Sequence, residues 1–224
     1  MSTKKIQGKG TGRWVTRSSM TVHQNRYFRV VQDEVTTPYG VDETHFFHRA
    51  GPAVMIIAMT DEFTFPLVET FRRGTRKHLW ELPGGGMDGQ ARKFPTRQRA
   101  LLIAKQELWE ETGYKASHWV FLSTVYPLPG QSDKKTYVFL ATGLTQTGKH
   151  KRETDGLGRM DHFSFAKAKH YMAKGRIREA TTGFTIAMAE AKVVEGLPKQ
   201  KAIKPRPVKR RTTSNRSVRR KKAA

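Results

Sequence analysis

The feature that most constrains this sequence is a run of three glycines, Gly84-Gly85-Gly86, followed by a stretch that carries three glutamates and ends at Gly113. That stretch predicts a helix that begins at Pro95-Thr96, because proline suits the first helical positions. The helix is expected to end at Gly113, since glycine readily adopts the left-handed conformation of a helix cap. We expect the glycines to form a turn ahead of the helix, so that turn and helix together organise the chain.

The three glutamates of this helix are Glu107, Glu110 and Glu111, at positions i, i+3 and i+4. This spacing places them on one face, where like charges repel by roughly 0.2–0.5 kcal/mol per pair unless a cation offsets them. Mg²⁺ prefers oxygen ligands and is often shared between carboxylates and substrate phosphates. A solvated acidic face is the alternative interpretation of the spacing alone. The glycines upstream favour a metal and phosphate site.

Composition excludes several classes of protein. The 224 residues suit one domain with tails, and no apolar run approaches the roughly 18 residues that would suggest a membrane span. The absence of cysteine excludes disulfides, thiolate zinc sites and cysteine nucleophiles. The chain begins with polar residues instead of an apolar export signal, so we expect a cytoplasmic protein.

The net charge of +23 is concentrated at the C-terminal end. Residues 199–224 contain twelve lysines and arginines and no acidic residue, which is just over half of the net charge. We expect a disordered N-terminal segment at 1–12, a folded domain at 13–197 and a disordered basic tail at 198–224. The tail is a candidate nucleic acid binder, but a basic run without interleaved aromatic residues also fits a solubilising tail.

The remaining pattern predicts strands and helices in an order typical of a mixed α/β sheet with helices on its faces. On the helix that ends at Gly113, Leu101, Ala104 and Leu108 form an apolar stripe expected to pack on the sheet. The expected strands are a hairpin of 27–36 and 43–48, a buried strand at 53–59, and strands at 63–71, 118–126, 136–142 and 160–165; two further helices are expected at 165–174 and 179–195.

The segment Gln106-Glu107-Leu108-Trp109-Glu110-Glu111-Thr112-Gly113 resembles the signature of the Nudix hydrolases. The resemblance runs from about Trp14 to Ala191, and over these residues the sequence is similar to the ADP-ribose pyrophosphatase branch of that family. It implies a Nudix-type α/β/α sandwich with a mixed β-sheet. Matching stretches outside the signature include Asn25 to Val30, Pro38-Tyr39-Gly40, Val68 to Arg72, Trp80-Glu81-Leu82-Pro83 and Pro129-Gly130.

The resemblance implies Mg²⁺-dependent hydrolysis, with Mn²⁺ as an alternative ion, of the pyrophosphate bond in a nucleoside diphosphate linked to another group. ADP-ribose or a nucleotide sugar is the expected substrate, giving a nucleoside monophosphate and a sugar phosphate. Cations are needed because the charged diphosphate repels a nucleophilic water. The resemblance also implies a homodimer. Glu107 and Glu111 would be the principal metal ligands, with help from Glu110 and the carbonyl of Gly84.

By the same resemblance Arg72 is expected to contact the substrate, and Arg73 and Arg76 of the basic loop 72–78 are expected to bind it by adding positive charge. The sequence departs from the family pattern elsewhere. Gln106 stands in place of an arginine, and the positions where a further glutamate is usual hold Gln90 or Gln98, with 89–96 as the expected insertion. After Pro129-Gly130, where this branch often has a catalytic glutamate, the sequence has Asp133 followed by Lys134, so Asp133 is the candidate base or metal ligand.

Two alternatives to the pyrophosphatase remain open. A Nudix-fold protein with weakened catalysis could bind RNA or a ribonucleoprotein through its basic surface and tail, an interpretation that Gln106 and Lys134 favour and the intact glutamates oppose. An enzyme acting on capped or 5′-phosphorylated RNA lies between the two, with the basic tail supplying affinity.

Overall fold

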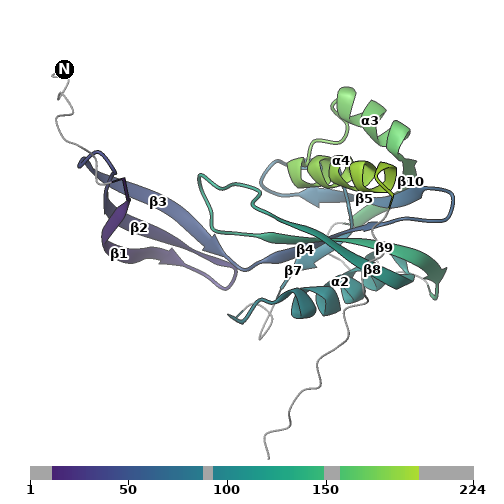
Figure 1. Ribbon diagram of the computed structural model, residues 1–224, viewed down its shortest axis with the longest axis horizontal. Coiled ribbons are helices and arrows are strands. Elements are labelled where there is room, and N and C mark those ends of the chain that lie inside the picture. The colour runs from purple at the N-terminus through teal and green to yellow at the C-terminus, as the bar shows by residue number, and fades with distance from the viewer. Residues whose placement is uncertain (1–11, 88–92, 149–156, 197–224) are drawn as a thin grey trace, which may run out of the picture.

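The computed structural model describes residues 12–87, 93–148 and 157–196 of the chain. Nearly all of the expected disordered segment at 1–12, the basic tail at 198–224 and Gln90 lie outside these ranges, so those expectations stay predictions. The described residues form a three-stranded arm that extends to one side and a body in which helices cover β-sheets (Figure 1).

The arm consists of β1 (Val15–Gln24), β2 (Phe28–Thr36) and β3 (Asp42–Ala50), which form an antiparallel sheet in that order. The predicted hairpin is confirmed, because β2 pairs with β3 and Gly40 adopts a φ of 77° in the turn between them. The sequence did not predict β1. All ten of its residues are exposed, so it lacks the alternation of apolar and polar positions that marks a half-buried strand.

The body is built around β4 (Ala53–Ala58), in which every residue is buried, as predicted for 53–59. It belongs to a four-stranded sheet of order β7-β4-β9-β8. β9 (Thr136–Gln146) runs parallel to β4, whereas β7 (Gly84–Gly86) is antiparallel to β4 and β8 (Tyr114–Val125) is antiparallel to β9. The predicted mixed sheet is therefore confirmed, with β8 and β9 longer than expected.

A second sheet has the order β10-β5-β6 and is fully antiparallel. It consists of β5 (Thr64–Arg72), β6 (Lys77–Glu81) and β10 (Leu157–Ser164), followed by the two predicted helices α3 (Phe165–Ala173) and α4 (Ala180–Val194). The sequence did not predict β6, and its first two residues, Lys77 and His78, were expected in the loop 72–78. In the part of the chain that the structure describes, no helix has the length and apolar character needed to span a membrane.

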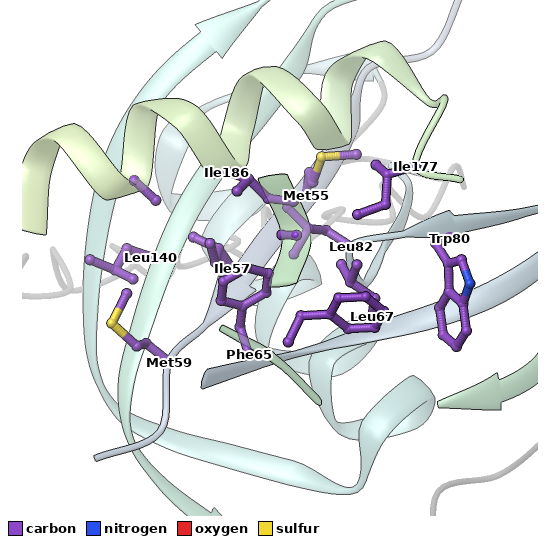
Figure 2. Packing of buried hydrophobic residues seen from close by; sticks show 13 residues of the cluster. Met55, Ile57, Met59, Phe65, Leu67, Trp80, Leu82, Leu140, Ile177 and Ile186 are labelled. Atoms are coloured by element: carbon purple, nitrogen blue, oxygen red, sulfur yellow. The ribbon is translucent and has the colours of Figure 1, made fainter. Parts of the chain in front are cut away.

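Two hydrophobic clusters lie on opposite faces of β4. Met55 and Ile57 belong to the cluster that contains Ile186 of α4 (Figure 2). Ile56 belongs to the cluster that contains Ala104 of α2 (Arg97–Thr112). Burying each large aliphatic side chain stabilises the fold by about 1.5–3 kcal/mol. This arrangement of α2, sheet and α4 is the expected α/β/α sandwich.

α2 begins and ends where the sequence predicts. The side chain of Thr96 accepts a hydrogen bond from the Arg99 amide at 3.2 Å, and Gly113 adopts a φ of 74° at the C-terminal cap. The predicted apolar stripe is confirmed, because the half-buried Leu101 packs against the same cluster as Ala104 and Leu108, which belong to the most buried row of the helix. That row repeats every four residues: Ala100, Ala104, Leu108 and Thr112.

Candidate active site

The glycine run forms the strand β7 and not the predicted turn. Gly84 lies opposite Met55 of β4 in an antiparallel register. A Cβ on Gly84 would overlap the backbone carbonyl oxygen of Val54, so only glycine allows β7 to pair this closely with β4. The glycine run is therefore needed because the backbones of β7 and β4 lie close together, and not because the chain reverses direction there.

The second glycine provides room for a side chain of α2. A Cβ on Gly85 would overlap the carboxylate of Glu107, whereas a Cβ on Gly86 would meet no atom within 4 Å. The carboxylate of Glu107 thus lies directly against β7. This contact links the glycine run to the glutamate helix, as the sequence predicts, although the run forms a strand and not a turn.

Glu111 also reaches β7, where its Oε2 accepts a hydrogen bond from the amide of Gly84 at 3.0 Å. Burial raises the pKa of Glu111 to about 8. The hydrogen bond from Gly84 opposes that rise, the nearby carboxylate of Glu107 adds to it, and the guanidinium of Arg72 lowers it. Two carboxylates are therefore held together at the edge of the sheet.

Glu110 does not join this pair. Its Oε1 accepts a hydrogen bond from Nε2 of Gln106 at 2.8 Å. Helix geometry explains the difference, because Glu110 and Glu111 point about 100° apart around the helix, while Glu107 and Glu111 are only about 40° apart. Among residues 12–87, 93–148 and 157–196, no three histidine or acidic side chains are gathered closely enough to hold a metal ion. The expected metal role of Glu110 thus stays a prediction that its present contact does not support.

The pair itself fits a hard divalent cation. Carboxylate oxygens are the ligands that Mg²⁺ prefers, and both Glu107 and Glu111 lie against β7. Their mutual repulsion and the raised pKa of Glu111 mark a place where positive charge is favourable. The structure brings together the side chains of these two predicted ligands. The amide of Gly84 contacts Glu111, and the role of the Gly84 carbonyl as a metal ligand stays a prediction.

An open pocket of about 420 Å³ lies beside β7 and is lined by Arg72 and Glu81 as well as by the glycines. Nε of Arg72 donates to Oε1 of Glu81 at 2.8 Å, and a second guanidinium nitrogen donates to Oε2. This hydrogen bonding raises the pKa of Arg72. The Glu81 side chain is only 5% exposed and that of Arg72 is 54% exposed, so Glu81 holds the guanidinium while leaving it open to the pocket.

Sequence reasoning missed three residues that line this pocket: Glu81, Lys134 and Glu179. Glu81 gave a signal, because an acidic residue that directly follows the apolar pair Leu79-Trp80 in a strand is unusual and needs a partner when it is buried. Glu179 caps α4 by accepting hydrogen bonds from the amides of Thr181 and Thr182 at 3.0 and 2.6 Å. Its position depends on the later course of the chain, so no local pattern could reveal it.

The other predicted site residues lie apart from the glutamate pair. Arg73 and Arg76 are exposed on the turn after β5 and do not line the 420 Å³ pocket. Asp133 accepts a hydrogen bond from the amide of Ala50 at 3.3 Å and pairs with Arg49 at 3.4 Å, so it lines two neighbouring hollows between arm and body. The structure does not bring Asp133 to the glutamates, and its catalytic role stays a prediction.

Comparison with known proteins decides the family. No protein-family model matches the sequence. The chain is, however, 34% identical to the ADP-ribose pyrophosphatase of Mycobacterium tuberculosis (strain ATCC 25618 / H37Rv) over 165 residues, which are 72% of this chain and 76% of that enzyme. The chain belongs to the Nudix hydrolase family. Within that family it lies in the ADP-ribose pyrophosphatase-like branch.

Two further relatives of this Nudix hydrolase match a smaller share of the chain. It is 30% identical over 136 residues to the CMP-5'-(N-acetyl-N-hydroxy-3-aminopropyl)phosphonate hydrolase of Streptomyces rubellomurinus (strain ATCC 31215), covering 61% of this chain and 63% of that protein. It is 31% identical over 123 residues to the ADP-ribose pyrophosphatase of Bacillus subtilis (strain 168), covering 55% and 62%. A crystal structure of an ADP compounds hydrolase shares the fold, with a TM-score of 0.66 and 21% identity over 87% of this chain and 99% of that one.

The departures from the family signature have visible structural consequences. Gln106, which replaces the usual arginine of the signature, donates its neutral amide to Glu110 instead of bringing a positive charge to the glutamates. Gln98 is exposed at the start of α2. The glutamate pair of this Nudix hydrolase is therefore offset by Arg72, which reaches it from β5.

Proposed function

We propose that this Nudix hydrolase cleaves the pyrophosphate bond of ADP-ribose or a nucleotide sugar, giving a nucleoside monophosphate and a sugar phosphate. The observation that carries the proposal is the convergence of Glu107 and Glu111 on β7 beside a pocket that exposes Arg72. Relatives named ADP-ribose pyrophosphatase support the choice of substrate. The phosphonate hydrolase makes CMP-linked compounds the next class to examine.

Different residues would bind the substrate phosphates and hold the metal ion in such a reaction. Arg72, clamped by Glu81, offers the exposed half of its guanidinium to a phosphate oxygen, and Lys134 lines the same pocket with a second positive charge. Glu107 and Glu111 would hold Mg²⁺, which when bound neutralises phosphate charge and makes water a better nucleophile. Binding a diphosphate between these groups would fix its orientation relative to the attacking water.

The test is hydrolysis of a substrate panel with Mg²⁺ or Mn²⁺, with products separated by chromatography. The panel holds ADP-ribose, nucleotide sugars, CMP-linked compounds and 5′-triphosphorylated RNA. We expect AMP and ribose phosphate from ADP-ribose, and loss of this activity in Glu111→Gln. Glu195→Gln removes a carboxylate at the exposed end of α4 and is the matched control. Equal turnover in both variants would contradict the proposed site.

We also propose that the chain forms a homodimer through its arm. The sheet of the arm exposes apolar side chains that the body of the same chain does not cover, and such surface is typical of an interface. These side chains are Trp14, Val15, Met20, Val22 and Phe46. Light scattering after size exclusion should give twice the mass of one chain, and Met20→Asp should shift it to one. A monomer at micromolar concentration would contradict the dimer.

RNA binding through the basic tail is the second candidate function, favoured by the twelve basic residues of 199–224. It predicts an affinity for RNA that falls steeply with salt and is lost when the chain ends at Leu197. If no member of the panel is hydrolysed, with Mn²⁺ as well as Mg²⁺, and RNA binds, the binding function replaces the enzyme.

A further inference from the structure

A second pocket lies on the other face of β6 from the candidate active site. Alternate residues of this strand face opposite sides, so Leu79 and Glu81 line the active-site pocket while His78 and Trp80 line the second pocket. Lys77, the exposed first residue of the strand, also lines the second pocket. The second pocket has a volume of about 440 Å³. It is lined by side chains from β5, β6, β10, α3 and the connection between α3 and α4.

Its lining is strongly basic. Lys77, Arg159, Arg176 and Arg178 carry four positive charges, and the imidazole ring of His78 lines the same pocket. These residues come from β6, β10 and the α3–α4 connection, so the fold and not the local sequence gathers them. Glu69 is the acidic residue of the lining, and its carboxylate lies 3.4 Å from Arg159. The pocket therefore keeps a surplus of about three positive charges.

Aromatic rings hold two of these guanidinium groups in place. Arg159 lies 5.0 Å from the ring centre of Trp80, and Arg176 lies 5.4 Å from that of Tyr171. Such cation–π contacts contribute about 0.5–1 kcal/mol at exposed sites, and they limit the freedom of long side chains before a ligand arrives. Trp80 is only 6% exposed, so its ring supports Arg159 instead of offering a stacking surface for a base.

We propose that this pocket binds a small anion with two or more linked phosphate groups, such as pyrophosphate or the polyphosphate part of a nucleotide. Several cations converging on one concave space match clustered phosphate charge, and guanidinium groups bind phosphate oxygens in pairs. A nucleic acid backbone would instead be matched by a stripe of cations along an open face. The pocket is separate from the proposed hydrolytic site, so this binding does not depend on that function.

The test is calorimetric titration of the full chain with tripolyphosphate, in EDTA so that no divalent cation assists binding at the glutamates. The salt concentration is about 0.15 M, at which long-range attraction by the basic tail is largely screened. We expect Arg176→Glu to weaken binding at least tenfold. Lys115→Glu makes the same charge change at an exposed position of β8 that does not line the pocket, and it should change the affinity less than twofold.

The outcomes separate a built site from diffuse charge. Equal weakening by Arg176→Glu and Lys115→Glu, or no weakening by either, would overturn the proposal. If Arg176→Glu lowers the midpoint of thermal unfolding, Lys77→Gln repeats the test without disturbing Tyr171. Pyrophosphate should bind and inorganic phosphate should bind much more weakly. Binding of a short RNA that depends on Arg176, with none of tripolyphosphate, would also contradict a small-ligand site.

Discussion

The two faces of β6 carry opposite charge, and the ways in which they do so differ. On one face burial raises the pKa of Glu111, and the nearby carboxylates of Glu107 and Glu81 raise it further. On the other face four basic side chains surround a pocket while remaining largely in water. Buried like charges destabilise a fold, whereas exposed ones are screened. A bound cation would therefore stabilise the acidic face, whereas the basic face is stable without a bound anion.

The largest expected effect comes from Glu111→Gln, which should lower the rate of hydrolysis by about 10³-fold, because a neutral amide is a poor ligand for Mg²⁺. The same change should stabilise the chain at high pH. The pKa of Glu111 is about 8 in the folded chain and ordinarily 4.5, so the folded chain holds a proton that the unfolded chain releases.

The contribution of Glu111 to the free energy of unfolding should consequently be highest below pH 4.5 and fall as the pH rises towards 8, by at most about 1.4 kcal/mol per unit. Urea titrations at several pH values in EDTA should show this fall in the natural chain and a flatter profile in Glu111→Gln. The same pH profile in both chains would contradict the conclusion that the buried Glu111 makes the acidic face sensitive to pH.

Gly85→Ala is expected to lower the rate of hydrolysis by about 10²-fold, because its Cβ would displace the carboxylate of Glu107 from β7. The displaced group is the end of a flexible side chain, so the midpoint of thermal unfolding should change little. Gly86→Ala is the matched control, since a Cβ there meets no atom within 4 Å. Equal rates in the two variants would show that the position of Glu107 is unimportant.

Arg72→Ala should raise KM about tenfold, because it removes the exposed guanidinium from the pocket. It should also lower the free energy of unfolding by about 1 kcal/mol, since Glu81 is left buried without its partner while water enters from the side where Arg72 stood. Combining Arg72→Ala with Glu81→Gln should recover part of that stability. If the double variant is no more stable than Arg72→Ala, the two residues are not coupled.

The smallest effect concerns Mg²⁺ in the absence of substrate. Mg²⁺ at millimolar concentration should raise the midpoint of thermal unfolding by a few degrees, because it binds the folded pair and not the unfolded chain. The shift should vanish in Glu111→Gln and persist in Arg176→Glu, since Arg176 lines the opposite face of β6. A shift of the same size in Glu111→Gln would place the ion elsewhere.

Local signals in the sequence predicted most of the fold. The fully apolar run at 53–59 gave β4, and Thr96 and Gly113 marked the ends of α2, because caps and burial act over a few residues. β1 was missed because an exposed strand has no burial pattern. The glycines were interpreted as a turn because three glycines in sequence do not reveal that a neighbouring strand lies too close for a side chain.

The site was predicted less completely than the fold. Helix spacing predicted that Glu107 and Glu111 share a face, but the hydrogen bond that occupies Glu110 depends on Gln106 and on side-chain rotation. Glu81 and Glu179 line the pocket from segments almost 100 residues apart, and only the packed sheets bring them together. Asp133 was chosen by its place in a loop, and its contact with Arg49 of the arm is a tertiary feature that no local pattern contains.

The linings of both pockets also depend on the register between β5 and β6, which is set by the number of residues in the turn that joins them. Arg72 lies opposite Lys77 and Glu69 opposite Trp80, and the turn between the strands places Arg76 at a φ of 55°. Because side chains alternate along a strand, a slip of β6 by one position would exchange Glu81 and Leu79 for Trp80 and His78. Inserting one residue into the turn 73–76, if it shifts the register of β6, would therefore exchange the linings of the two pockets. The carboxylate of Glu81 would lie among the arginines, and the indole of Trp80 would lie beside β7.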